Sequence, residues 1–300
     1  MSGCLWYLPE METVSTFLSQ KPCGPLYHYT DARGLLGIFE RKEIWASDAL
    51  HLNDAKERSH AGEVLVDQLG ARVSDGTISV AERDALLGAL RYHQTVDPLG
   101  VSSDYVASLS ENGDQLSQWR AYCPQGNGFS LGLSTSDLGY VIGQTRFRLV
   151  KCVYDPEQQR ALIRAMMKYF LPRGLGWRES SPRARIEVEW CAAIMLAIKD
   201  PSFAEEQEWR LVGSVLSTRD HRRSFRQGRF GIVPYIPLPL CPPNQKPSYS
   251  HVYVGPNAEP GIARKAVIGM LQDWGRVVVG EPQAHDKVLG SRVPFRYASA

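Results

Sequence analysis

A stretch near the N-terminus, residues 26–47, constrains the fold more than any other part of the chain. Residues 27–30 (Tyr-His-Tyr-Thr) are aromatic and β-branched, which predicts a strand whose side chains alternate between opposite faces. Apolar residues then recur at helical spacing over 35–39, after a polar opening, and predict a short amphipathic helix. Residues 44–47 predict a second short strand. A strand, a helix and a strand in immediate succession predict a domain that combines both kinds of element.

The same patterns divide the rest of the chain into helices and strands. Helices are expected over 10–21, 54–69, 80–92, 157–171, 182–199 and 260–274, with a short one that ends at Tyr122. Strands are expected over 101–110, 128–134, 146–154, 208–215, 230–238, 251–254, 277–279 and 293–296. Together these elements predict one α+β domain over residues 25–300, preceded by a lead-in helix within 1–24. Helical insertions are expected at about 53–95 and 156–200.

Composition excludes some classes of protein and favours others. Apolar residues make up 43% and charged residues 22% of the 300, which is typical of a globular protein with a core. The net charge of +2 favours neither a nucleic-acid coat nor a membrane surface, and there is no apolar run long enough to span a bilayer. The six cysteines are scattered without C-x-x-C spacing, and the N-terminus lacks a signal-peptide layout. We therefore expect a cytoplasmic protein with reduced thiols.

His28 is the first candidate functional residue, because it is a polar side chain within an otherwise apolar strand. A lone histidine in this position is more often a core residue bonded to a backbone carbonyl. However, Tyr27, His28, Tyr29 and Thr30, with a following strand that ends in Ser47, resemble the first motif of ADP-ribosyltransferases of the His-Tyr-Glu kind. The resemblance implies an ADP-ribosyltransferase-like split sheet, mixed or antiparallel, with helical insertions. It also implies that His28, Tyr29, Thr30 and Ser47 bind NAD.

The second candidate stretch joins a strand end, Ser108 to Ser110, to a short helix that ends Trp119-Arg120-Ala121-Tyr122-Cys123. It resembles the segment in which poly-ADP-ribose-type transferases place an aromatic ring against nicotinamide, although Trp119 replaces a small serine of that pattern. The resemblance implies that Ser108, Ser110, Trp119 and Tyr122 line the NAD site and that either ring could stack on nicotinamide. The alternative is that both rings, three residues apart on one helical face, belong to the core.

The third candidate stretch is Glu206-x-Glu208 at the start of a predicted strand. It resembles the Glu-x-Glu of transferases, in which a carboxylate stabilises the positive charge that develops as nicotinamide leaves. The resemblance implies that Glu208 is the catalytic carboxylate. It implies that Glu206 is the acceptor-side partner within the NAD site, or a bystander. Two alternatives need no catalysis: the acidic run could be a solvated loop, and Arg210 could pair with a glutamate for structural reasons.

A second resemblance concerns the chain as a whole. The 26–47 stretch, with Leu52-Asn53-Asp54-Ala55-Lys56-Glu57 after it, resembles the bacterial family catalogued as domain of unknown function 2971. This resemblance extends over nearly the whole chain, and it implies no chemistry.

One basic stretch stands out against the nearly neutral chain. It runs from Arg219 to Arg229 and contains five arginines, at positions 219, 222, 223, 226 and 229. We expect either a solvated loop or a surface that receives a polyanionic acceptor such as nucleic acid.

These observations lead to one main functional hypothesis and two alternatives. The main hypothesis is NAD-dependent ADP-ribosyl transfer to a macromolecular acceptor, or NAD hydrolysis, with Glu208, His28 and Tyr122 close together as catalytic residues. By analogy, such an enzyme could act as a bacterial toxin or an anti-phage defence effector with an antitoxin or another partner protein. The first alternative is a metal-dependent nuclease or hydrolase that uses Asp54, Glu57, Glu206 and Glu208. The second is a non-catalytic binding module on the same fold.

Overall fold

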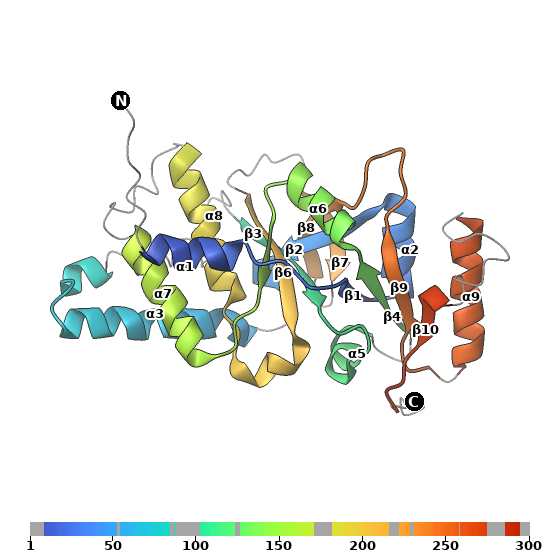
Figure 1. Cartoon of the computed structure of the whole chain (residues 1–300), viewed down its shortest axis with the longest axis horizontal. Coiled ribbons are helices and arrows are strands. Elements are labelled where there is room, and N and C mark those ends of the chain that lie inside the picture. The colour runs from blue at the N-terminus through green and yellow to red at the C-terminus, as the bar shows by residue number, and fades with distance from the viewer. Residues whose placement is uncertain are drawn as a thin grey trace.

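The structure is a computed structural model of the chain, and it describes residues 9–52, 55–84, 87, 103–123, 127–170, 182–215, 222–228, 231–257, 259–274 and 286–294. In this part of the chain, a mixed sheet of ten strands runs through the molecule, and helices pack against both of its faces (Figure 1). The protein therefore combines helices with a mixed, open sheet, as the alternation of sequence patterns predicts.

The helices have the following bounds: α1 Pro9–Leu18, α2 Ala32–Arg41, α3 Ala55–Ser74, α5 Leu116–Tyr122, α6 Thr135–Gln144, α7 Pro156–Phe170, α8 Pro182–Ala197 and α9 Pro260–Asp273, with 3-10 turns η1 Ala49–His51 and η4 Pro201–Glu206. The strands are β1 Leu26–Asp31, β2 Glu43–Asp48, β3 Ser103–Ser110, β4 Gly128–Leu133, β5 Arg148–Lys151, β6 Glu208–Val215, β7 Ser224–Gly228, β8 Gly231–Pro239, β9 Tyr249–Val254 and β10 Val288–Gly290.

Most predicted elements are present, and four differ. Helix α6 was not predicted, and the strand expected over 146–154 covers only Arg148–Lys151. The basic stretch is not simply a loop, because residues 224–228 form β7. The closing strand is β10, whereas residues 293 and 294 belong to no strand. The strand expected over 277–279 lies outside the described residues, as does part of the helix expected over 80–92.

Strand β3 is the branch point of the sheet. It pairs with β6 along its whole length, but it meets β2 only near Ser47↔Val106 and β1 only at Tyr27↔Ser110. Within the described residues, β1 and β2 do not pair with each other. The edge of β3 over residues 107–109 therefore lies between two diverging strands, and we call this interruption in the pairing the split.

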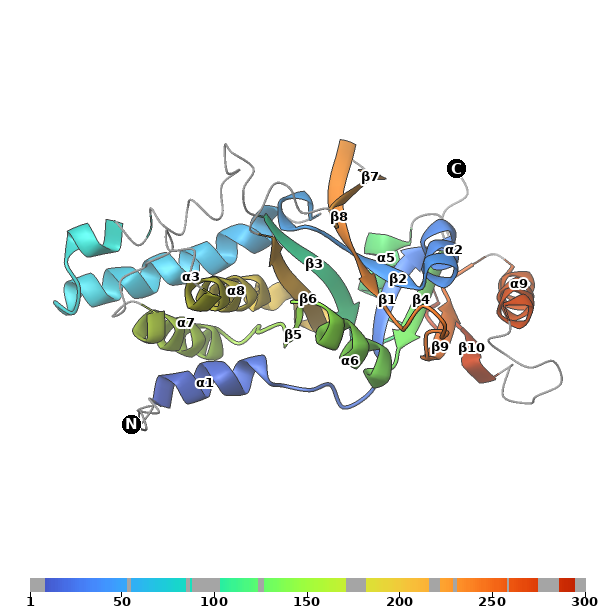
Figure 2. The same ribbon diagram turned by 90° about the horizontal axis from the view of Figure 1, so that it is seen from above.

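Two hydrophobic cores cover the two faces of the sheet. In the first, apolar residues of the sheet such as Leu109 and Leu211 pack with α2, α6 and α9. In the second, Val106, Val150 and Val212 pack with α1, α3, α7 and α8. Figure 2 shows α1, α3, α7 and α8 stacked together at one end of the molecule, with α2 and α9 at the other. The lead-in helix α1 is thus part of the second core, through Val14 and Phe17.

The junction of β1 and α2 shows why the first sequence motif has its form. The Oδ1 atom of Asp31 accepts a hydrogen bond from the backbone N–H of Gly34 at 2.7 Å, which caps the helix. A Cβ atom at Gly34 would lie 1.9 Å from the hydroxyl oxygen of Thr30, so any larger residue here would force the Thr30 side chain to move. The predicted ligand Thr30 is therefore packed against the start of α2.

In the part of the chain that is described, no helix is both long and apolar enough to cross a membrane.

Candidate functional site

The three sequence motifs fall on three strands that lie side by side. Tyr27 of β1 pairs with Ser110 of β3, and Ser110 pairs with Glu208 of β6. Tyr27 therefore lies in one row across the sheet with two residues that follow it in the sequence by about 80 and 180 positions. Because neighbouring strands are roughly 5 Å apart, the backbones of β1 and β6 are separated by about 10 Å at this level.

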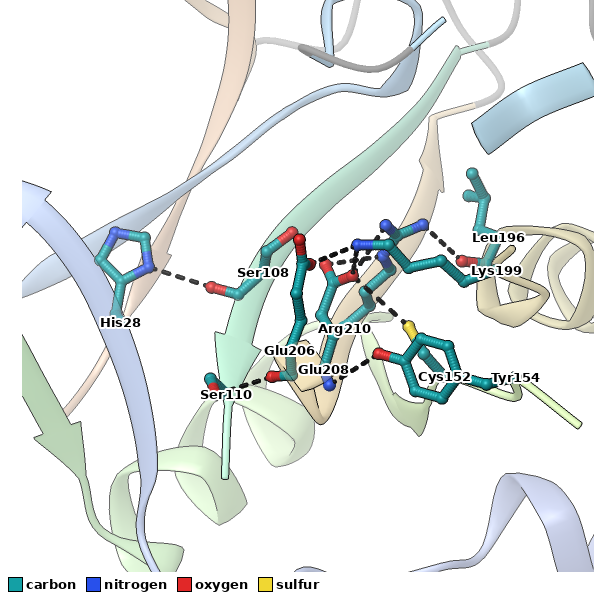
Figure 3. Close-up of polar contacts among 10 residues, drawn as sticks. All are labelled: His28, Ser108, Ser110, Cys152, Tyr154, Leu196, Lys199, Glu206, Glu208 and Arg210. Atoms are coloured by element: carbon teal, nitrogen blue, oxygen red, sulfur yellow. Dashed lines mark hydrogen bonds and ion pairs between the residues drawn. The ribbon is translucent and has the colours of Figure 1, made fainter. Parts of the chain in front are cut away.

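His28 turns toward the edge of β3 at the split. Its Nδ1 atom lies 3.1 Å from the carbonyl oxygen of Ser108 (Figure 3). A carbonyl oxygen only accepts hydrogen bonds, so Nδ1 must carry the hydrogen. Burial lowers the pKa of His28 and outweighs the bond to Ser108, which raises it; the charge of Arg226 lowers it further. The ring is therefore neutral at pH 7, with the lone pair of Nε2 available to accept a hydrogen bond.

Ser47, the predicted ligand on β2, lies beside an arginine from the basic stretch. The Nη2 atom of Arg226 donates to the hydroxyl oxygen of Ser47 at 2.9 Å. Arg226 reaches this position because β7 pairs with β8, and β8 pairs with β2. The structure thus places Ser47, Arg226 and His28 around the split, where sequence reasoning had separated the arginine from the other two.

Glu208 lies at the centre of a buried cluster of charges (Figure 3). Its Oε2 atom accepts from Lys199 Nζ at 2.7 Å, and Arg210 donates to both carboxylate oxygens at 2.8 and 2.9 Å. Burial alone would raise the pKa of Glu208, but the charges of Arg210 and Lys199 lower it to about 2. Glu208 is therefore ionised and fully paired, which confirms the structural pairing of Arg210 with a glutamate.

Glu206 is the more accessible carboxylate of the pair. Its Oε2 atom accepts from Lys199 Nζ at 2.5 Å, and its side chain is 13% exposed, against 4% for Glu208. In Figure 3 its carboxylate lies beside Ser108, on the side of that residue away from His28. Gln207, between the two glutamates, has a left-handed conformation with φ of 45°, which is uncommon for a residue other than glycine. The chain therefore turns sharply where Glu206 meets β6.

Cys152 and Tyr154 complete the surroundings of Glu208. The Cys152 thiol lies 3.7 Å from Glu208 Oε2, and the backbone N–H of Glu208 donates to the Tyr154 hydroxyl oxygen at 2.9 Å. Burial raises the pKa of Tyr154, so the phenol is neutral. These neighbours and Lys199 were missed in the sequence. Lys199 comes directly after the apolar pattern of α8, and only long-range packing makes it the shared cation.

Of the predicted aromatic residues, Trp119 belongs to a core cluster with Tyr29. Trp119 is fully buried, its ring centroid lies 4.7 Å from that of Tyr29, and its Nε1 donates to Asp114 at 2.8 Å. Tyr29 bridges the backbone as well, because its hydroxyl donates to the Asn112 carbonyl and accepts from the Gln115 N–H. Burial thus favours the core interpretation of Trp119 over stacking on nicotinamide.

Tyr122, at the end of α5, is 37% exposed, and its role stays a prediction. Side chains alternate along β1, so His28 points away from the face on which Tyr29 meets Trp119 of α5. Among the described residues, neither Tyr122 nor Glu208 makes a hydrogen bond or ion pair with His28. The expected close grouping of these three residues stays a prediction.

The two predicted serines of β3 have different surroundings. Ser110 is buried, donates to the carbonyl oxygen of Glu206 at 2.8 Å and accepts from the N–H of Asn112 at 3.1 Å. It therefore fixes the turn that carries Glu206. Ser108 contributes its carbonyl to His28, so it positions the histidine from the edge of the split.

Of the four carboxylates in the metal-dependent alternative, Glu206 and Glu208 are the two whose side chains the structure describes. Asp54 lies outside the described residues, and so does the side chain of Glu57. Glu206 and Glu208 are both engaged by Lys199. Among the described residues, no group of three or more histidine, cysteine, aspartate or glutamate side chains is arranged to hold a metal ion.

Comparison with known proteins gives one match. Residues 118–211 match the model of a family described as "Protein of unknown function (DUF2971)". Neither the curated proteins nor the solved structures include a match. The matched stretch runs from α5 into β6 and contains the Lys199–Glu206–Glu208–Arg210 cluster, whereas His28, Ser47 and Arg226 lie outside it. Over residues 118–211 the chain is thus similar to this family of unknown function, a shorter span than the sequence resemblance implied.

Proposed function

We propose that the protein cleaves NAD at the split and transfers ADP-ribose to a macromolecular acceptor or to water. The observation that carries this proposal is the row Tyr27↔Ser110↔Glu208, which aligns the three transferase-like motifs on three adjacent strands. The backbones of β1 and β6 are about 10 Å apart there, a span that a nicotinamide riboside can bridge. His28 on β1 and a carboxylate at the start of β6 are the residue types that NAD cleavage requires in this proposal.

Within this proposal the accessible Glu206, rather than Glu208, is the carboxylate that faces the substrate. Positive charge develops on the ribose as nicotinamide leaves, and a nearby anion stabilises it. Lys199 and Arg210 already neutralise the charge of Glu208, and the residue is enclosed. Glu206 pairs with Lys199 and is more exposed than Glu208. Glu208 would then hold the two cations in place and so position Glu206.

His28 would orient the ribose. Its Nδ1–H is committed to the Ser108 carbonyl, so Nε2 can accept a hydrogen bond from a ribose hydroxyl. The bond to Ser108 therefore fixes both the tautomer and the orientation of the His28 ring before any ligand binds. Tyr122 is the partly exposed aromatic of the second motif, and it is the ring that the proposal assigns to nicotinamide.

The direct test follows nicotinamide release from NAD by the purified chain. Glu206→Gln removes the charge and keeps the shape, so we expect a rate roughly a hundredfold lower with an unchanged unfolding transition. Glu205→Gln is the matched control, because this neighbouring carboxylate has the same charge and accepts only a long hydrogen bond, 3.5 Å from Gln115 Nε2, among the described residues. We expect the control to retain the parent rate.

The outcomes separate the roles of the two glutamates. Glu208→Gln removes the negative charge that Lys199 and Arg210 pair with in the interior. We therefore expect this variant to lose stability together with activity. Full activity in Glu206→Gln would refute its assignment. A parent protein that binds NAD and never releases nicotinamide would instead support the non-catalytic module.

A further inference from the structure

The hairpin of β7 and β8 brings an arginine to the split, and no carboxylate among the described residues pairs with it. Ser47 pairs with Tyr235, and Tyr235 pairs with Ser224, so these residues share one face of the sheet. Arg226 lies two residues after Ser224 and therefore points to the same side. Its Nη2 reaches Ser47, while Phe225 points the other way and is 63% exposed.

The hydrogen-bonding capacity of Arg226 is largely unused. The guanidinium has five N–H donors, and within the described residues its recorded bond is the one to the Ser47 hydroxyl. Its Nε atom is buried and has no acceptor, and no ion pair involves this side chain in the described part of the chain. A charge withdrawn from water is costly when it is unpaired. Burial lowers the pKa of Arg226 for the same reason.

The described groups around Arg226 do not oppose its positive charge. Its charge acts on His28, whose pKa it helps to lower, so the ring beside it is neutral. Ser47 uses its oxygen to accept from Arg226, which leaves the hydroxyl hydrogen free to be donated. A guanidinium and a hydroxyl that both have hydrogens to donate form a site for an anionic oxygen.

We propose that Arg226 and Ser47 bind a phosphate group of a nucleotide. In the reaction proposed above this would be the diphosphate of NAD, so the inference rests on that function and names a second part of its site. The planar fork of arginine matches two phosphate oxygens, and the bonds are strengthened by the charges on both partners. The Ser47 hydroxyl would donate to a third oxygen.

The geometry favours a nucleotide over a nucleic-acid strand. Binding a polyanion uses several cations that face outward and neutralise successive phosphates. Arg226 is a single inward-facing guanidinium, partly buried beside the split, and it suits one phosphate or diphosphate group. The polyanion surface expected from the basic stretch would have to use its other arginines.

The test is a calorimetric titration of the full chain with inorganic pyrophosphate, ADP-ribose and a single-stranded oligonucleotide. Arg226→Gln should weaken binding of pyrophosphate and ADP-ribose about ten- to a hundredfold, since a charged hydrogen bond is lost. Arg226→Lys keeps the charge and loses the fork, so we expect an intermediate affinity. Arg222→Gln is the matched control on an exposed arginine, with affinity within about twofold of the parent.

Three results would overturn the inference: no binding of pyrophosphate or ADP-ribose by the parent, equal binding by parent and Arg226→Gln, or an effect on the oligonucleotide alone. The proposed function fails separately. If both phosphate ligands depend on Arg226 and NAD is never cleaved, the phosphate site stands without the reaction. If NAD is cleaved and Arg226→Gln leaves its affinity unchanged, the phosphate site alone is wrong.

Discussion

Two arginines in this sheet, Arg210 on β6 and Arg226 on β7, show opposite states of pairing. Arg210 is buried, contacts both oxygens of Glu208 and donates to the Leu196 carbonyl at 2.7 Å. Arg226 is partly buried and donates to a neutral hydroxyl, and its buried Nε has no acceptor among the residues that the structure describes. The first arginine completes a cluster that balances two carboxylates with two cations. The second leaves a positive charge in need of a partner.

The difference separates a site that supports the fold from one that can take up a ligand. A saturated cluster offers a ligand little, because each new bond must displace an existing one. An unsatisfied guanidinium gains a bond without losing one. The strongest sequence candidate, Glu208, is therefore engaged by Lys199 and Arg210. The proposals accordingly place ligand binding at Arg226 and at Nε2 of His28.

The largest expected effect comes from removing the shared cation of the saturated cluster. Lys199→Met leaves Glu206 and Glu208 without their common partner, so we expect the free energy of unfolding in urea to fall by about 3–5 kcal/mol. Arg226→Met is the matched variant at the unsaturated site, and its cost should be about 1 kcal/mol or less. Equal costs for the two variants would mean that the two regions do not differ in this way.

Acid should weaken the saturated cluster and leave the unsaturated arginine unaffected. The folded-state pKa of Glu208, about 2, lies below its usual 4.5, so its stabilising contribution is complete above pH 4.5 and is lost as the pH falls through 2. The full loss amounts to about 3 kcal/mol. Unfolding measured from pH 7 downward should show this acid limb in the parent and in Arg226→Gln, and a shallower one in Glu208→Gln. If Glu208→Gln lost stability at low pH as steeply as the parent, the pairing of Glu208 with Lys199 and Arg210 would be contradicted.

The smallest expected effect is on the titration of His28. Burial is the main cause of its lowered pKa, and the charge of Arg226 is a minor one. Arg226→Gln should therefore raise the pKa of His28 only slightly, as measured from the NMR shifts of the ring hydrogens. Arg222→Gln should leave it unchanged. A pKa that is insensitive to Arg226 would place the two side chains too far apart for one site.

Periodicity predicts the elements of this fold better than their partners. Strands β1, β3 and β6 follow from short apolar and β-branched patterns, because local alternation reflects burial on a sheet. Helix α6 was missed although Ser134 and Asp137 form a capping box, since Gly139 and Gly143 interrupt the apolar pattern that follows. Element type is thus encoded locally, and weak local signals are where prediction fails.

The site depends on contacts that no local pattern specifies. Arg226 resembles its neighbouring arginines in sequence, and only the pairing of β7 with β8 decides that it faces Ser47. Lys199 and Glu208 meet because α8 packs against β6. The acidic Glu206-x-Glu208 pattern indicated that the region matters, but the balance of charge around each carboxylate comes from residues elsewhere in the chain.

The bond between His28 and Ser108 lets the ring change its charge without disturbing the sheet. The Nδ1–H is present in both the neutral and the protonated imidazole, so the carbonyl of Ser108 keeps its donor in either state. Proton uptake and release are confined to Nε2. Any ligand that brings negative charge to the split would favour the protonated ring, and the strands around it would keep their positions. The split can thus exchange a proton as a rigid part of the molecule.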